Sequence, residues 1–144
     1  MIRQCLAIAM ALAVIPTTLA AEDARQLVNM PAPMVQHMLG NMRDHLLALT
    51  EIQQSLGKGE FLQAGEIAEK RIGMSSLNSH GAAHMAKFMP TPMQDIGTAM
   101  HQAASRFAKV AQESSVDGNA LRAIDALSDI TRQCVACHAA YRAH

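Results

Sequence analysis

The sequence predicts an all-α protein, folded as an antiparallel up-down-up-down four-helix bundle. Half of its 144 residues are apolar but only 3% are aromatic, so Ala, Leu, Ile and Met supply most of the apolar material. These residues mostly favour helices, and the residues that favour strands are scarce. Apolar residues also recur at three- and four-residue spacing in four stretches separated by short connections. Four amphipathic helices joined in this way pack most simply as a bundle.

The N-terminal segment predicts export. Arg3 precedes an apolar stretch at residues 5–15, Pro16 interrupts it, and small residues lead to Ala20. This is the pattern of a secretory signal peptide, and the stretch is too short to span a membrane. We therefore expect a signal peptide at residues 1–20 and a mature periplasmic domain at residues 21–144, with no membrane insertion. Removal of Cys5 with the signal leaves Cys134 and Cys137.

The first predicted helix begins at the Pro-Ala-Pro sequence of residues 31–33, because proline is tolerated in a first helical turn. It is expected to end near residue 56, before the Gly-Lys-Gly sequence. Its inward stripe is rich in methionine and contains Met34, Met38, Met42, His45, Leu49, Ile52 and Leu56.

The other three helices are expected at residues 60–77, from residue 91 to a turn at 114–119, and from there nearly to the C-terminus. Thr91 is the expected N-cap of the third, with Pro92 in its first turn and Gln94 closing a capping box. Gly81 and Pro90 indicate that residues 78–90 form a structured connection.

The fourth helix carries the motif Cys134-Val-Ala-Cys137-His138. Two thiols three residues apart on a helix can form thioethers with both vinyl groups of one haem, while the next histidine reaches the iron. A zinc site would need four ligands, and a second cysteine pair is lacking. A thioredoxin-like disulfide would need a βαβ pattern. We therefore expect one covalent haem c, with His138 as a ligand of the iron.

The nine residues from Cys134 to Arg142, at the end of the last of four helices, resemble the C-terminal signature of the cytochrome c′ family. The resemblance implies that Cys134 and Cys137 carry the haem and that His138 is the proximal ligand. It also implies that Arg142 lies near that histidine or a haem propionate, and that the protein forms a homodimer through its first two helices. The family contains five-coordinate members and low-spin relatives whose sixth ligand is a methionine of the first helix.

The distal ligand is predicted from the depth of the iron in the bundle. Up-down topology brings the haem motif, the start of the first helix and the 78–90 connection to one end. At about 1.5 Å per residue, the depth of His138 matches residues 37–39 of the antiparallel first helix. Met38 lies there on the inward stripe, and thioether sulfur is a good haem ligand. Met34 and Met42 are the neighbouring alternatives, and an alignment that puts Leu39 at this position leaves the distal face open.

Histidines elsewhere suggest a second metal. His80 and His84 are four residues apart, and Met85, Met89 and Met93 follow, a ligand set that suits copper. The alternative is that the methionines pack over the haem edge and the histidines are exposed. On the first helix, His37 is expected to be solvated and His45 to be a hydrogen-bonded core residue.

These observations predict a monohaem electron-transfer protein, with small redox proteins or membrane electron-transport components as partners. A five-coordinate binder of nitric oxide or another small gas is the first alternative, and a haem protein that also binds copper at residues 80–93 is the second. An enzyme is not expected, because the sequence offers no nucleophile–base pair. Formal charge is zero and the chain lacks a basic run, which argues against nucleic acid as a partner.

Overall fold

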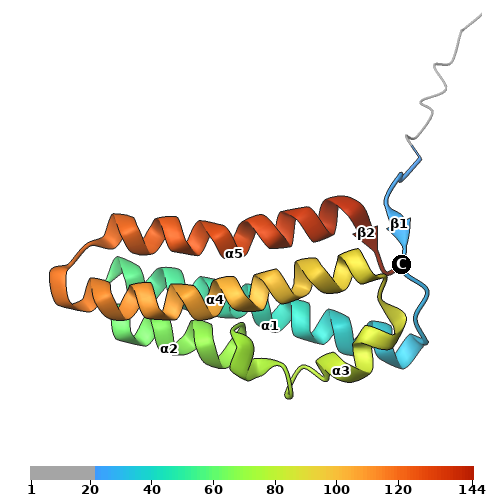
Figure 1. Cartoon of the computed structure of the whole chain (residues 1–144), viewed down its shortest axis with the longest axis horizontal. Coiled ribbons are helices and arrows are strands. Elements are labelled where there is room, and N and C mark those ends of the chain that lie inside the picture. Colours follow the sequence, from blue (N-terminus) through green and yellow to red (C-terminus); the bar gives the residue numbers. More distant parts are fainter. Residues whose placement is uncertain (1–21) are drawn as a thin grey trace, which may run out of the picture.

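The computed structural model describes residues 22–144, so the predicted signal peptide lies outside the described residues. In this part the all-α prediction is confirmed. The described chain has five α-helices, two 3₁₀ turns and one pair of two-residue strands, which is one helix more than expected. The four longer helices lie side by side (Figure 1), and they are α1 (Ala32–Gly57), α2 (Phe61–Arg71), α4 (Thr91–Asp117) and α5 (Ala120–Ala140).

The extra helix lies in the expected connection between α2 and α4. It is the single turn α3 (Ala82–Met85), preceded by the 3₁₀ turn η1 (Met74–Ser76) and followed by η2 (Ala86–Phe88). None of the helices in residues 22–144 combines the length and apolar character that a bilayer crossing requires.

Small residues allow the longer helices to approach closely. α2 packs against α1 and α4, and α4 against α5. Ala64, Ala68 and Ala104 are fully buried between them. A Cβ atom on Gly65 would lie 3.0 Å from the carbonyl oxygen of Ala108, so the crossing of α2 and α4 depends on that glycine.

The second helix ends six residues earlier than predicted, at Arg71 rather than residue 77. The next residues form a different set of hydrogen bonds. The Ser75 hydroxyl donates to the carbonyl of Glu69 (2.7 Å) and the Ser76 hydroxyl to that of Gly73 (2.7 Å). Serine side chains can bond to backbone groups in place of the helical hydrogen bonds. Here Ser75 and Ser76 stabilise η1, the tight turn that follows α2.

The predicted capping box is wrong. The N-cap of α4 is Pro90, Thr91 is already helical, and the cap residue makes no side-chain hydrogen bond. Gln94 instead donates its side-chain amide to the carbonyls of Ala86 (3.0 Å) and Met89 (2.8 Å), which ties both ends of η2 to α4.

The connection between α4 and α5 is two residues long. Gly118 has a φ of 69°, a left-handed conformation that favours glycine. The Asn119 side chain then accepts a hydrogen bond from the backbone N–H of Arg122 (3.1 Å) and caps α5. The reversal therefore falls at the end of the predicted 114–119 turn.

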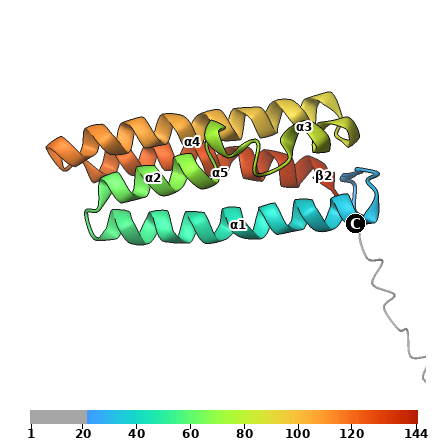
Figure 2. The same ribbon diagram turned by 90° about the horizontal axis from the view of Figure 1, so that it is seen from below.

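Two short parallel strands were not predicted. β1 (Gln26–Leu27) pairs with β2 (Tyr141–Arg142), and the N–H of Val28 donates to the carbonyl of Arg142 (2.8 Å). Figure 2 shows the N-terminal segment returning to the end of α5. Two-residue strands leave no periodic pattern, and their pairing depends on the rest of the fold bringing the chain ends together.

Candidate functional site

The two cysteines lie one turn apart near the C-terminal end of α5. Both are free and half-buried. Cys134 packs against the main core formed by α1, α2, α4 and α5, and its Sγ lies 3.5 Å from the carbonyl oxygen of Ile130. Burial raises the pKa of both thiols above the usual value, so both are protonated at neutral pH.

His138 follows on the same side of the helix. A residue four positions after Cys134 lies about 40° further round the helix. Its side chain is exposed, and its carbonyl accepts a long hydrogen bond from the Arg25 side chain (3.4 Å). The three residues of the motif thus occupy the last two turns of α5, next to the paired strands.

A methionine cluster faces this end of α5. Its buried members come from the N-terminal segment, α1, α3 and α4, and half-buried residues pack around them, including Cys137. The buried residues are Val28, Met38, Met85 and Met93, and the half-buried ones are Met30, Met34, Met42, Met89, Cys137, Tyr141 and Ala143.

The methionine cluster confirms that the three segments expected at one end of the fold meet there. Met38 is 8% exposed, whereas Met34 and Met42 are only half-buried. Met38 is therefore the most deeply placed of the three candidate distal ligands. Two thiols one turn apart, an adjacent histidine and an apolar wall with thioether sulfurs form a donor set that fits haem c.

Arg142 lies on β2, at the edge of the same end. Its Nε atom is 3.7 Å from a carboxylate oxygen of Asp23, and its carbonyl takes part in the strand pairing. Hydrogen bonds from Arg25 lower the pKa of Asp23 to about 2, so this carboxylate is charged at neutral pH. The predicted role of Arg142 toward His138 or a propionate stays a prediction.

A second group, which the sequence did not predict as a unit, is formed by His45, His80 and His101. The ring centroids of His45 and His80 are 4.8 Å apart, those of His80 and His101 5.6 Å, and those of His45 and His101 6.1 Å. We call these residues the histidine triad. Each belongs to a different segment: α1, the connection between η1 and α3, and α4.

The prediction that His45 is hydrogen-bonded is wrong. Its side chain is 6% exposed, and its Nε2 atom is buried without a hydrogen-bond partner. Burial lowers the pKa of His45 to about 4, and the neighbouring imidazoles of His80 and His101 act in the same direction. Burial also lowers the pKa of His80. Both rings are therefore neutral at pH 7.

The predicted pairing of His80 with His84 is not seen. His80 belongs to the triad, whereas His84 is exposed beside Phe88, with ring centroids 6.1 Å apart. Met85 turns into the methionine cluster. As they stand, no three His, Cys, Asp or Glu side chains within residues 22–144 are arranged to hold a metal ion.

His37 is exposed, as expected, but it also has a structural role. Its Nε2 atom is 2.8 Å from the carbonyl oxygen of His80, which also accepts from the Asn41 side chain (3.0 Å). A carbonyl can only accept, so His37 donates from Nε2.

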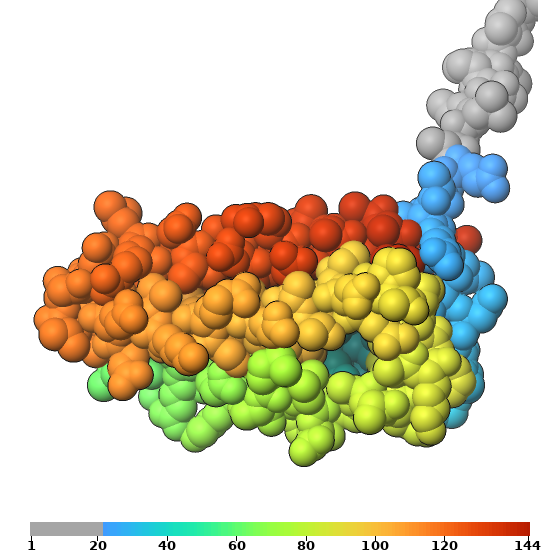
Figure 3. All heavy atoms as spheres, viewed as in Figure 1, coloured from blue at the N-terminus to red at the C-terminus, as the bar shows by residue number. Residues whose placement is uncertain are grey.

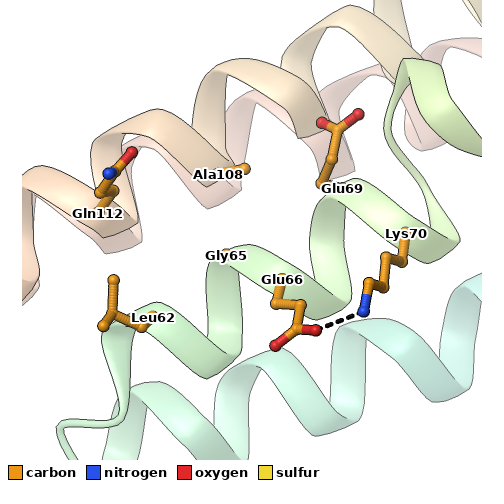
Figure 4. Close-up of a pocket in the computed structure, with 7 residues that line it drawn as sticks. All are labelled: Leu62, Gly65, Glu66, Glu69, Lys70, Ala108 and Gln112. Atoms are coloured by element: carbon orange, nitrogen blue, oxygen red, sulfur yellow. Dashed lines mark hydrogen bonds and ion pairs between the residues drawn. The ribbon is translucent and has the colours of Figure 1, made fainter.

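A surface groove of about 280 Å³ lies elsewhere, between α2 and α4 (Figure 4). Leu62 and Gln112 border it at one end, and Glu66 pairs with Lys70 at its rim. Its lining contains no cysteine, histidine or methionine. The groove therefore offers none of the chemistry found at the end of α5 or in the histidine triad.

Comparison of the chain with models of protein families, with curated proteins and with solved structures found no match.

Proposed function

We propose that this protein is a periplasmic monohaem c-type cytochrome that transfers single electrons. The observation that carries the proposal is the position of Cys134 and Cys137, free and half-buried one turn apart on α5, with His138 as the next residue. The methionine cluster around Cys137 supports it, because it supplies an apolar wall and thioether sulfurs.

In this proposal the chain's own residues attach, orient and insulate the cofactor. Cys134 and Cys137 would hold a haem through two thioethers, each formed when a thiol S–H adds across one vinyl C=C to give C–S and C–H. His138 would ligate the iron through its imidazole, and Met38 would do so through its sulfur. A haem bound there supplies a one-electron couple, and the buried methionines exclude water and raise its potential.

We also propose that the fold is the four-helix bundle expected from the sequence, with α3 as a structured part of one connection. α3 is a single turn, and Gln94 of α4 donates to the backbone beside it. α1, α2, α4 and α5 then form the bundle, and the haem motif lies at the end of its last helix.

Expression with and without a c-type maturation system tests the haem proposal. Cys134→Ser with Cys137→Ser should abolish covalent haem, measured as haem staining and as the mass of the denatured chain. His138→Ala should keep both thioethers and lose the low-spin spectrum. His144→Ala, which removes the other histidine at this end of the chain, is the matched control. A chain that gains no covalent haem in a competent host would refute the proposal.

Absorption spectra of Met38→Leu test the distal ligand. The ferric wild type should be low-spin, and the variant high-spin with nitric oxide bound more readily. Met42→Leu, one turn away and half-buried, is the control and should remain low-spin. A wild type that is already high-spin would contradict methionine ligation and favour the gas-binding alternative.

A further inference from the structure

The ring centres of the histidine triad are close to the spacing of imidazoles that share one metal ion. With a metal–nitrogen distance of about 2.0–2.1 Å, the centre of a coordinated imidazole lies roughly 3.2 Å from the metal, so two rings at a tetrahedral or trigonal angle are about 5.2–5.5 Å apart. The three centroid distances, 4.8, 5.6 and 6.1 Å, bracket these values.

Hydrogen bonds leave the same nitrogen free on two of the rings. The Nδ1 atom of His101 contacts the carbonyl oxygen of Ile72 (2.5 Å) and must donate to it. The Nδ1 atom of His80 lies 3.3 Å from Ser76 Oγ, whose own proton is donated to the carbonyl of Gly73, so His80 donates to the hydroxyl. A ring whose Nδ1 donates its single proton keeps the lone pair on Nε2. A hydrogen bond from the other ring nitrogen is also how proteins orient metal-bound histidines.

The third ring contributes a buried nitrogen with nothing bound to it. His45 is 6% exposed and its Nε2 atom has no partner. A buried polar atom left unsatisfied destabilises the fold, so native proteins seldom keep one without a compensating function. Its ring is the closest in the triad to that of His80, at 4.8 Å.

The segments that carry the triad also border a surface hollow, and charged groups act on two of its rings. Figure 3 shows a hollow bordered by α4 and by the connection between η1 and α4, with α1 as its floor. These are the three segments that carry the triad. His80 is half-buried, and the carboxylate of Asp44 acts on both His45 and His80, offset at His45 by Arg71. A cation held by the rings would therefore be attracted by the carboxylate of Asp44 and repelled by the guanidinium of Arg71.

We propose that His45, His80 and His101 bind one late first-row transition-metal ion, such as Zn²⁺ or Cu²⁺, through their imidazole nitrogens. Neutral imidazole is a preferred ligand of both ions, and three histidines leave a fourth position for water. No three His, Cys, Asp or Glu side chains of the described chain are arranged to hold a metal as they stand. Binding therefore includes rotation of the rings, and His45, which no hydrogen bond at Nε2 restrains, turns most. This site is independent of the haem.

Titration of the purified chain, without an affinity tag and with any free thiols alkylated, tests the proposal. ZnCl₂ added to chelator-treated protein should bind with one high-affinity equivalent per chain and raise the unfolding temperature. His45→Leu and His101→Gln should each weaken Zn²⁺ binding by at least roughly 100-fold, since even outer partners of metal ligands are worth about 10- to 100-fold. Leucine relieves the unsatisfied nitrogen at residue 45, and glutamine can still donate to the carbonyl of Ile72, so both variants should fold.

His84→Ala is the matched control, because His84 lies four residues from His80 but is exposed and outside the triad. It should bind Zn²⁺ as the wild type does. Absence of a stoichiometric site in the wild type would overturn the proposal, as would binding that survives in either triad variant or is lost in His84→Ala. Haem content measured on the same samples separates this result from the outcome of the haem proposal.

Discussion

Acidification from pH 7.5 to pH 5 should destabilise the metal-free protein through His45. Its pKa is about 4 in the folded chain, against an ordinary value of 6.5, so the unfolded chain binds more protons between these values. Stability therefore rises with pH across that window and is lost as the pH falls through it. For one such group the loss between pH 7.5 and pH 5 is about 2 kcal/mol. In a domain of this size it corresponds to a fall of roughly 8 °C in the unfolding temperature.

Circular dichroism at 222 nm in the presence of a chelator would measure this change, with the His45→Leu variant beside the wild type. The groups that act on the charge of His45 are the imidazoles of His80 and His101, the carboxylate of Asp44 and the guanidinium of Arg71. Asp44 and Arg71 keep their charges throughout this range, because their ion pair lowers the pKa of the carboxyl and raises that of the guanidinium. Leucine should remove most of the slope and make the protein more stable at pH 5. Parallel profiles for the two proteins would refute the assignment of the pH dependence to His45.

Further predictions concern local structure at Gly81, Gly97 and Asn119. Gly81→Ala should destabilise the protein by about 1–3 kcal/mol, because φ is +63° and the new Cβ would lie 3.2 Å from His37 Nε2. Gly97→Ala, in an open part of α4, should instead stabilise it by about 0.5–1 kcal/mol; urea unfolding measures both, and a stabilised Gly81→Ala would contradict the strain argument. Asn119→Ala should cost about 1 kcal/mol by removing the cap of α5, whereas Asn119→Asp, which can still accept from Arg122, should cost little.

The helices could be predicted because their signals are local. A stripe such as Met38, His45 and Ile52 repeats every seven residues, and each of these residues is buried in α1. Where a tertiary contact competes with a local signal, the sequence predicts the structure less well. Thr91 and Gln94 match a capping box. Gln94 instead donates to two carbonyls, one at each end of η2, and only the tertiary structure brings these carbonyls within reach of its side chain.

The Cys134-Val-Ala-Cys137-His138 motif could be singled out from the sequence because its residues are contiguous. The histidine triad could not, because its members come from three segments separated by 35 and 21 positions. The sequence did contain a partial signal, since His45 lies on an inward stripe. The nearest-neighbour argument that paired His80 with His84 failed because Gly81, in a left-handed conformation, separates the two residues before α3 begins.

The methionine cluster and the histidine triad share one helix, α1. Met38 and His45 are seven residues apart, so they lie on one face, about two turns or 10 Å along the axis. Methionine at this face is compatible with an ordinary core, because a thioether can be buried at little cost. Two buried imidazoles beside a half-buried third are not, since an apolar side chain in place of His45 would remove an unsatisfied nitrogen and fill similar space. Residues that leave a protein less stable than an alternative residue would are concentrated at functional sites. On physical grounds the triad is therefore as strong a candidate for function as the Cys134–His138 motif.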